Sequence, residues 1–408
     1  MTKPARKSIT VILATTALAA VLAACSQPAP TPAPTPGPSA ALPAQQTTPT
    51  AAEAQAAMNT DGLAPSATLP GAAQASASPV GQAIDAASFA LPANAVVKDG
   101  AVNPPLAKAP AGAAAAKTAN DRNRLIRAEV LLDRARFSPG VIDGQGGTNL
   151  KLALTAYQGA HGMPQTGLLD EPTFAALTAA DSAPVMQDYT ITAEDAAGPY
   201  TPKFAPDDYA AMSKLPKLGY ATPREALAER FHMDENLLAA LNPGADFAKA
   251  GTVIVVTAPR TGKLAAVSSI EVDKALGEVR AYDEGHKLLA VYPATVGSTE
   301  RPAPDGEWAV RAVAPHPTYT FDPTRLTYGK LKTKVVIAAG PNNPVGAAWI
   351  DLTKDTFGIH GAPDPRLINK RASHGCVRLT NWDVVDLAAA VKKGAKVTFL
   401  GAETRAKT

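Results

Sequence analysis

Two stretches near the C-terminus decide how this chain folds and what it does: Ile359-His360-Gly361-Ala362-Pro363 and Ser373-His374-Gly375-Cys376-Val377-Arg378. A thiol nucleophile needs a nearby imidazole that helps it to lose its proton. It also needs backbone N–H groups, commonly freed by glycine, to bind the oxyanion that forms on the substrate. An arginine can hold a substrate carboxylate through two parallel hydrogen bonds. Because all of these residue types lie within residues 359–378, the two stretches predict an enzyme with a cysteine nucleophile.

The same residues resemble the signature of the L,D-transpeptidase family, also called the YkuD-type domain. That signature is a His-Gly pair followed by a Ser/Thr-His-Gly-Cys-x-Asn/Arg motif, and this chain matches it at every position. The resemblance covers residues 265–401 and implies a mostly-β catalytic domain. The roles that it implies are Cys376 as nucleophile, His360 as general base and later acid, the Gly361 carbonyl as the group that orients the His360 ring, Gly375 and Cys376 as oxyanion donors, Ser373 and His374 as pocket residues, and Arg378 as the group that binds a substrate carboxylate.

The resemblance also implies a reaction on peptidoglycan. Cys376 would attack the carbonyl of the third stem-peptide residue and expel the fourth residue, D-Ala. The side-chain amine of another stem would then attack the thioester, which gives a 3–3 cross-link. Water as the acceptor would give L,D-carboxypeptidase action instead, and a protein amine would attach a lipoprotein to the wall. The sequence does not separate these acceptors, nor a hydrolase of the same fold from a transpeptidase.

The motif contains two histidines, and either could serve as the base. His374 is two residues from Cys376, and side chains two apart on a strand share a face with their backbones about 6–7 Å apart. His360 comes from a separate segment and can meet the thiol directly, so we expect His360 to be the base. A zinc site at this histidine pair would need a third or fourth ligand at matching spacing. None is evident in the sequence, and we expect neither a metal nor another cofactor.

The N-terminus has the layout of a secretory signal. Lys3, Arg6 and Lys7 form a basic start, and an apolar run follows that ends in small residues. The ending Leu22-Ala23-Ala24-Cys25 resembles the lipobox of bacterial lipoproteins. This resemblance implies a signal peptide over residues 1–25, a lipid on Cys25 and a cell-envelope location, with Ser26 favouring the outer membrane. The alternatives are an ordinary signal peptide or an uncleaved anchor helix.

Cys25 and Cys376 are the two cysteines of the chain. If Cys25 carries lipid, Cys376 has no partner for a disulfide. A free thiol in an oxidising compartment is a liability unless it is used. A small buried core cysteine is the alternative, because free cysteines are often buried.

Residues 26–118 are rich in Pro, Ala, Ser, Thr and Gln and have no lasting apolar period. This composition predicts a disordered tether between the membrane and the folded part. The net charge of +3 is small for 408 residues. Because nucleic-acid binding usually needs a concentrated basic face, no nucleic-acid partner is expected.

Two modules are expected between the tether and the catalytic domain. Residues 119–181 show short amphipathic helices around an Asp-Gly turn, with Asp170 as a helix cap, and they resemble a small three-helix peptidoglycan-binding domain. Residues 185–258 show strand, helix, helix, Asn-Pro turn and strand, which resembles a LysM glycan-binding module. The segment between Thr192 and Thr222 is longer than that family usually has. A generic helical bundle and a linker domain that merely orients its neighbours are the respective alternatives.

The last domain shows strands near 268–272, 278–283, 287–296, 307–313, 334–339 and 396–400, with a helix over 382–392. The fold class is therefore a multidomain α+β protein. Its expected partners are peptidoglycan stem peptides and glycan, and the membrane through the lipid. A non-catalytic wall anchor is the alternative from another class of function, and the complete His360, Cys376 and Arg378 set argues against it.

Overall fold

The computed structural model describes residues 74–89, 119–205, 207–324, 331–371, 373 and 375–403. All of these fall within one compact unit, Pro43–Thr408. The signal segment with Cys25 and most of the expected tether lie outside the described residues. So does His374. No helix of the described ranges is long and apolar enough to cross a membrane.

The prediction of disorder over 26–118 is wrong for residues 74–89, which hold helix α2 (Pro79–Asp85). Ile84 of this helix is fully buried. The Asp85 carboxylate accepts hydrogen bonds from the backbone N–H groups of Val185 (2.7 Å) and Met186 (3.1 Å). Since α2 is only seven residues long, its apolar side repeats too few times to stand out from the surrounding Ala- and Pro-rich sequence. Tertiary contacts hold it in place.

The three helices expected in the next module are confirmed as α3 (Ala119–Arg134), α4 (Thr148–Ala160) and α5 (Glu171–Ala180). Asp170 caps α5 as predicted, because its side chain accepts the Thr173 N–H at 3.0 Å. Gly144 in the turn before α4 has φ +68, and a Cβ there would lie 2.7 Å from Ile126. The turn therefore requires glycine.

The middle module has the expected order of strand, helices and strand. It contains β1 (Met186–Thr190), α6 (Ala193–Ala197), α7 (Tyr209–Met212), α8 (Pro223–Arg230), α9 (Glu235–Leu241) and β2 (Val253–Thr257). Strands β1 and β2 pair antiparallel. The long segment that the sequence could not assign carries α6 and α7. Helices α8 and α9 are the two that the sequence predicted, and the LysM-like identity of the module stays a prediction.

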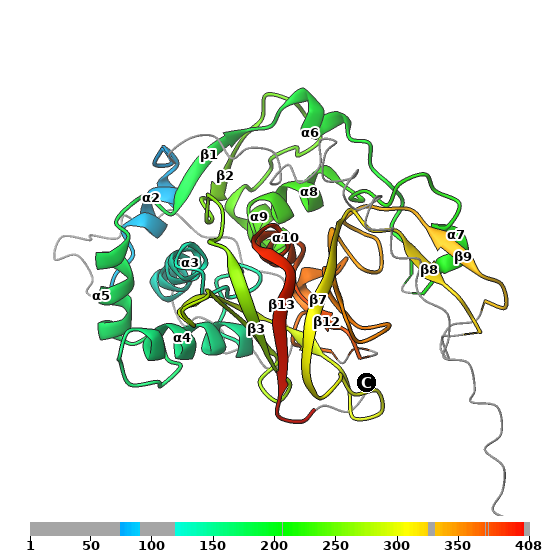
Figure 1. Cartoon of the computed structure of the whole chain (residues 1–408). Helices are drawn as coiled ribbons and strands as arrows, with labels where there is room; N and C mark the ends of the chain where they lie inside the picture. Colours follow the sequence, from blue (N-terminus) through cyan, green and yellow to red (C-terminus); the bar gives the residue numbers. More distant parts are fainter. Residues whose placement is uncertain are drawn as a thin grey trace, which may run out of the picture. The chain divides into compact units, whose positions relative to one another are not determined.

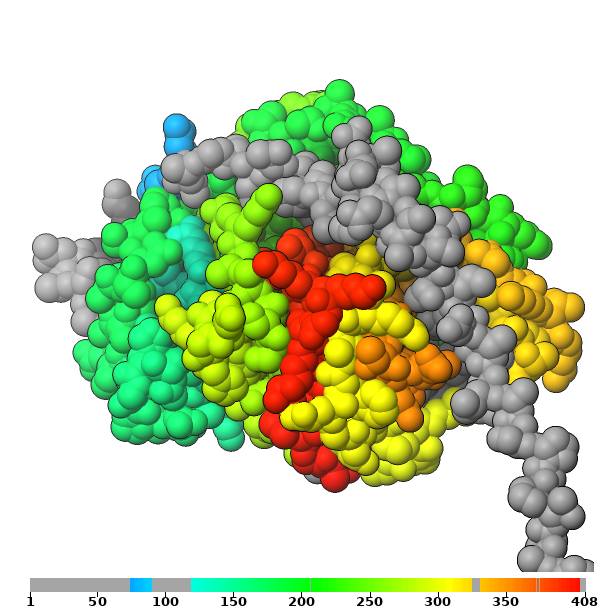
Figure 2. All heavy atoms as spheres, in the orientation of Figure 1, coloured from blue at the N-terminus to red at the C-terminus, as the bar shows by residue number. Residues whose placement is uncertain are grey.

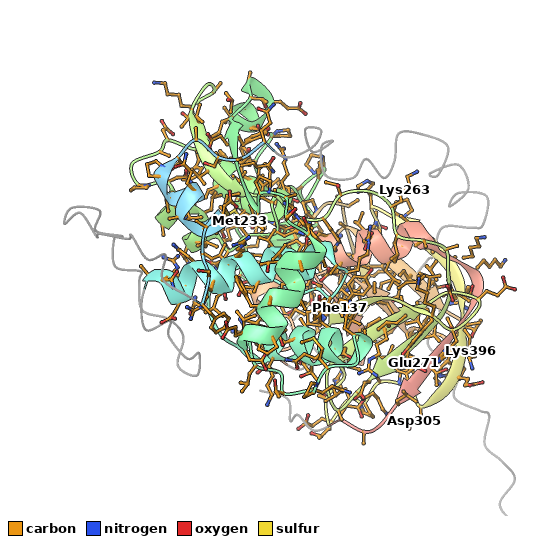
Figure 3. The ribbon with its side chains drawn as sticks, turned by 90° about the vertical axis from the view of Figure 1, so that its left-hand side faces the viewer. Phe137, Met233, Lys263, Glu271, Asp305 and Lys396 are labelled. Carbon is orange, nitrogen blue, oxygen red and sulfur yellow. The ribbon has the colours of Figure 1, made fainter. Side chains whose placement is uncertain are left out.

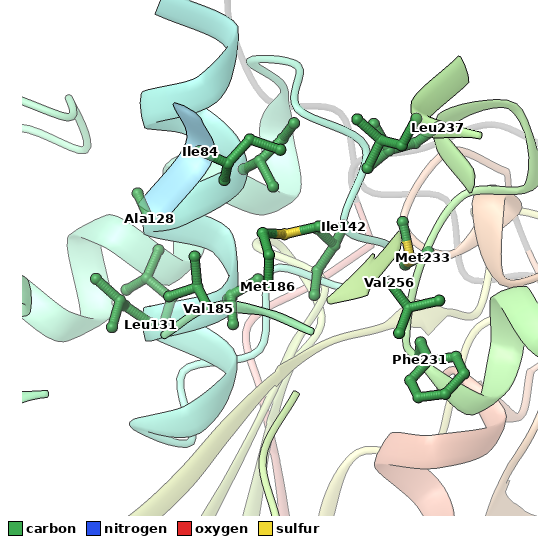
Figure 4. Packing of buried hydrophobic residues seen from close by; sticks show 14 of the residues in the cluster. Ile84, Ala128, Leu131, Ile142, Val185, Met186, Phe231, Met233, Leu237 and Val256 are labelled. Carbon is green, nitrogen blue, oxygen red and sulfur yellow. The ribbon is translucent and has the colours of Figure 1, made fainter. Parts of the chain in front are cut away.

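The helical module and the middle module share one hydrophobic core (Figure 4). Leu131 of α3 lies in the same buried cluster as Met186 of β1 and Val256 of β2. Arg134 at the end of α3 donates hydrogen bonds to the carbonyls of Pro184 (2.6 Å) and Ala258 (2.7 Å). The boundary expected between residues 181 and 185 therefore does not separate two independent cores.

The C-terminal domain is mostly β, as predicted, and is built on a nine-stranded sheet (Figure 1). Its strands are β3 (Val267–Asp273), β4 (Glu278–Tyr282), β5 (Leu288–Pro293), β6 (Thr295–Val296), β7 (Gly306–Pro315), β10 (Ala348–Leu352), β11 (Gly358–His360), β12 (Val377–Arg378) and β13 (Val391–Leu400). The strand order is β5-β4-β3-β13-β7-β10-β11-β12-β6. Figure 2 shows the residues of β13 at the surface between those of β3 and β7. A separate hairpin pairs β8 (Tyr319–Phe321) with β9 (Val335–Ile337).

The predicted C-terminal helix is confirmed as α10 (Asn381–Ala390), which ends two residues early because β13 begins directly at Val391. Strand β5 lies at the edge of the sheet. Phe137, labelled in Figure 3, pairs with Val291 of β5, and the Ser138 N–H donates to the Val291 carbonyl at 2.9 Å. The chain after α3 thus covers an edge that would otherwise expose unpaired backbone groups.

A buried charge network ties the modules to α10. The guanidinium of Arg260 donates to Asp133 of α3 and, at 2.7 Å, to Asp383 of α10. Burial alone would raise the pKa of Asp133, but Arg260 and His232 hold that pKa well below its usual range. The His232 ring stacks on Trp382 with centroids 4.9 Å apart. Because removing one partner of a buried ion pair leaves an uncompensated charge, this network holds the modules in one arrangement.

Candidate active site

His360 is the last residue of β11 and lies between β10 and β12 in the sheet. Its side chain is buried, and its Nδ1 atom lies 2.7 Å from the Gly361 carbonyl oxygen. A carbonyl can only accept a hydrogen bond, so Nδ1 carries the proton in this contact. In this tautomer the neutral ring has its lone pair on Nε2, as a general base requires. The contact expected between Gly361 and the His360 ring is therefore present.

The surroundings of His360 keep its ring neutral. Burial and the nearby positive charge of Arg378 lower the pKa of His360 to about 3. The Trp349 ring stacks on the imidazole, with centroids 5.2 Å apart and the planes tilted by 19°. A ring with this pKa is unprotonated at neutral pH, as a general base has to be before it accepts a proton.

Cys376 directly precedes β12, which runs parallel to β11. His360 pairs with Arg378 in this register. Side chains alternate between the two faces of a strand, and residues two apart share a face. The register therefore assigns His360 and Arg378 to one face of the sheet. Cys376, on the segment next to β11, packs against the hydrophobic cluster that contains Trp349, and the Trp349 ring stacks on His360.

The Cys376 sulfur has the surroundings of a resting thiol. It is half-buried. Its Sγ atom lies 3.7 Å from the Thr356 carbonyl oxygen, which can accept the thiol proton in a hydrogen bond. Burial raises the pKa of Cys376, while a hydrogen bond from the Gly358 backbone and the charge of Arg378 act in the opposite direction. The net shift favours the thiol, so a base must remove the proton when the sulfur attacks.

Arg378 is half-buried and lies close enough to affect the pKa of both His360 and Cys376. Its Nε atom is buried and has no hydrogen-bond partner among the described residues. A buried donor without a partner is costly. A guanidinium with a spare donor at this position is suited to binding an anionic group of a ligand.

The loop before Cys376 is held by Ser373. The Ser373 hydroxyl donates to the Cys376 carbonyl at 2.6 Å and accepts the Gly375 N–H at 3.3 Å. The Ser373 N–H donates to the Gly297 carbonyl at 2.9 Å. Ser373 is buried, so its hydroxyl shapes the turn, whereas the resemblance implied a pocket residue. Gly375 has φ +111, and a Cβ there would lie 2.9 Å from the Phe357 ring.

Sequence reasoning missed two residues beside His360. Trp349 stacks on the imidazole, and the Asn381 side chain accepts the Ala347 N–H at 2.9 Å next to Gly361. Asn381 follows the motif by only three residues, which is the one signal that could have indicated it. Across the described residues, no group of three or more His, Cys, Asp or Glu side chains could hold a metal ion. The absence of a cofactor stays a prediction.

Comparison with known proteins agrees with this geometry. Residues 268–399 match the L,D-transpeptidase catalytic domain, and residues 122–177 match a putative peptidoglycan binding domain. The putative L,D-transpeptidase YkuD of Bacillus licheniformis is 29% identical over 177 residues, which cover 43% of this chain and 92% of that protein. The putative L,D-transpeptidase YkuD of Bacillus subtilis is 32% identical over 114 residues, covering 28% of this chain and 55% of its own. The probable L,D-transpeptidase YbiS of Escherichia coli is 27% identical over 197 residues, which cover 47% of this chain and 64% of that protein.

Among solved structures, the L,D-transpeptidase (Yku) from Stackebrandtia nassauensis is similar at 14% identity and a TM-score of 0.26, covering 68% of this chain and 93% of its own. The L,D-transpeptidase from Mycobacterium smegmatis is similar at 15% identity and a TM-score of 0.27, and the match covers 36% of this chain and 63% of that chain. Because these scores are low, only the sequence matches indicate a class of protein. By these matches, residues 268–399 are similar to an L,D-transpeptidase catalytic domain. Residues 122–177 are similar to a putative peptidoglycan binding domain, and the relatives named above are putative or probable L,D-transpeptidases.

Proposed function

We propose that this chain is an L,D-transpeptidase that forms 3–3 cross-links in peptidoglycan through a thioester on Cys376. The observation that carries the proposal is the pairing of β11 with β12 inside the matched catalytic domain. That pairing puts the buried neutral histidine and the half-buried free thiol on adjoining segments, which supports the proposal. Neither group alone would support acyl transfer at neutral pH, because the thiol keeps its proton until a base takes it.

The proposed first step is attack of the Cys376 sulfur on the carbonyl carbon of the third stem residue. Nε2 of His360 takes the thiol proton as the C–S bond forms, and the carbonyl π electrons move to its oxygen. N–H groups of Cys376 and Gly375 are the proposed oxyanion donors. The Gly375 N–H would exchange its long contact with Ser373 for this bond. Collapse of the intermediate breaks the bond to D-Ala, whose nitrogen receives the proton from His360.

In the proposed second step, the amine of an acceptor stem attacks the thioester carbonyl and loses a proton to His360. The new amide forms as the C–S bond breaks, and the Cys376 thiolate takes the proton back from the imidazolium. Arg378 is proposed to bind a substrate carboxylate throughout, through the donor that has no partner among the described residues. Water in place of the amine would make the same site an L,D-carboxypeptidase.

The products that the purified protein forms from a disaccharide-tetrapeptide substrate test this proposal. We expect mass spectrometry to detect dimers that have lost one D-Ala. Tripeptide monomers without dimers would favour the hydrolase of the same fold. Unchanged substrate, from protein that unfolds cooperatively and still sediments with wall sacculi, would contradict both and favour the wall anchor.

We also infer that a lipid on Cys25 anchors the chain in the cell envelope, with the outer membrane favoured over the inner. The support is the small-residue run before Cys25 and the match of two downstream domains to wall proteins. Cells fed an alkyne-tagged fatty acid should label the wild-type chain, and Cys25→Ala should lose the label and leave the membrane fraction. Label retained on Cys25→Ala would contradict this inference.

The helical module is proposed to hold the enzyme on peptidoglycan, supported by its domain match over residues 122–177. The middle module is proposed either to bind glycan, as a LysM-like module would, or to orient its neighbours. Its order of strands and helices supports the first role. The hydrogen bonds between α8 and the catalytic domain support the second.

A further inference from the structure

We propose that Glu229, in helix α8 of the middle module, is a positioning residue for His360 and acts through Asn381. The middle module would then contribute a residue on which catalysis depends. This inference rests on the proposed role of His360 as the base. It goes further because the contact that supports the histidine comes from outside residues 268–399, the extent of the catalytic domain match.

Asn381, the first residue of α10, is packed against the backbone that follows His360. Its Oδ1 accepts the Ala347 N–H at 2.9 Å. A Cβ added to Gly361 would lie 2.3 Å from this Oδ1, and one added to Gly346 would lie at the same distance. The amide oxygen therefore sits against both glycines. Gly361 is also the residue whose carbonyl fixes the His360 ring.

Glu229 fixes the other end of the same amide. Asn381 Nδ2 donates to the two carboxyl oxygens of Glu229 at 3.1 and 3.3 Å, and to the Pro341 carbonyl at 3.1 Å. With Oδ1 accepting from Ala347, both ends of the Asn381 amide have hydrogen-bond partners. Both side chains are buried, so water cannot readily replace a lost partner. The amide is thus held in one orientation by a residue about 150 positions away in sequence.

The charge state of Glu229 suits this role. Burial, followed by the negative charges of Glu225 and Asp364, raises its pKa to about 8, against the opposing hydrogen bonds from Asn381 and Tyr220. The Tyr220 hydroxyl lies 3.3 Å from Oε2. Glutamine matches a neutral carboxyl in shape and charge and keeps one oxygen that can accept from Asn381 Nδ2, so Glu229→Gln should preserve the position of the Asn381 amide.

The consequence for His360 follows from the short path between the groups. Without Glu229, Asn381 Nδ2 keeps only Pro341, and its amide can rotate away from the Ala347 N–H. Gly346 and Gly361 would then lose the oxygen that packs against them, and the Gly361 carbonyl could move. A shift of about 1 Å at a catalytic group can cost on the order of 100-fold in rate.

A matched contact separates positioning from simple docking of the two modules. Asn342 Nδ2 donates to Glu225 Oε1 at 3.2 Å, which also joins the catalytic domain to α8. In the described part of the chain, neither side chain makes a hydrogen bond with Asn381 or His360. Asn342→Ala therefore removes one hydrogen bond of the same interface and leaves the hydrogen bonds of Asn381 to Glu229, Pro341 and Ala347 in place.

The test uses the full chain with Glu229→Ala, Glu229→Gln, Asn381→Ala and Asn342→Ala. We expect Glu229→Ala and Asn381→Ala to lower kcat by about 10- to 100-fold with KM changed by less than about 3-fold. Glu229→Gln should keep kcat within about 3-fold of wild type, and Asn342→Ala should be unchanged. The double variant Glu229→Ala/Asn381→Ala should be no slower than the worse single variant, because both act through one contact. Thermal unfolding confirms that each variant is folded.

A second readout does not depend on turnover. The Nδ1–H proton of His360, observed by NMR, should shift or disappear in Glu229→Ala and stay in Asn342→Ala. A full kcat and an unmoved signal in folded Glu229→Ala would overturn the proposal. So would equal losses in Glu229→Ala and Asn342→Ala. If Glu229→Ala does not fold, Asn381→Asp, which cannot donate to Glu229, carries the same expectations. If the wild-type chain is inactive, the proposed function fails, while the NMR signal still decides whether Glu229 positions the ring.

Discussion

Cys376→Ala should lower transpeptidation by at least about 10⁴-fold, because no other group can form the thioester. The described part of the chain contains one free cysteine, Cys376. Alanine removes the sulfur and leaves the loop contacts of Ser373 in place, since these involve backbone atoms of residue 376. The variant should therefore fold like wild type, with a melting temperature within a few degrees.

A carbapenem gives a readout that does not need the natural substrate. A cysteine thiol can open a β-lactam, so wild-type protein should gain the mass of one carbapenem at Cys376, and Cys376→Ala should gain none. Cys376→Ser is the matched control, because it replaces the thiol with a hydroxyl of similar size that is a weaker nucleophile. An adduct on Cys376→Ala, or an unmodified wild-type mass after incubation, would contradict the proposed site.

The catalytic motif was the easiest part of the chain to predict, because its residues lie close together in sequence. The orienting contact between His360 and Gly361 is between neighbours, and the structure contains it at 2.7 Å. The strands that carry these residues were harder to predict. Strands β11 and β12 have three and two residues, too few to show a period. Strand β10 is buried at all five positions, so its sequence lacks the alternation that marks a half-exposed strand.

Contacts between modules left no signal in the sequence. Arg260 bonds to Asp133 and Asp383, which lie 127 and 123 residues away in sequence. No spacing rule connects such positions, and a charged residue in a linker normally indicates a solvated surface. The same is true of Glu229, which looks like an ordinary polar residue of a helix with an exposed face. Helix α2 was missed for a related reason, because its order depends on Val185 and Met186.

His360→Ala should lower kcat by about 10³-fold, within the range that general base catalysis supplies. His374→Ala is the comparison, and we expect it to cost much less, because the Gly361 carbonyl orients the Nδ1–H of His360 and leaves the lone pair on Nε2. A larger loss in His374→Ala would reverse the assignment. Activity has to be measured in both variants at the same enzyme concentration, with the melting temperature as the check on folding.

The pH dependence makes the His360 prediction sharper. Because burial and Arg378 lower the pKa of His360 to about 3, kcat/KM of the wild-type chain should show no acid limb near pH 6.5, where an ordinary histidine would lose its base function. The same shift has a consequence for stability. Between about pH 6.5 and 3 the unfolded chain binds a proton on this ring that the native state does not, so His360 makes the native state progressively less stable as the pH falls through that window. His360→Ala should therefore lose less stability than wild type between pH 6.5 and 4. An acid limb near pH 6.5 that disappears in His360→Ala would instead mean that the ring titrates in the free enzyme, and that the buried neutral base is the wrong description of this site.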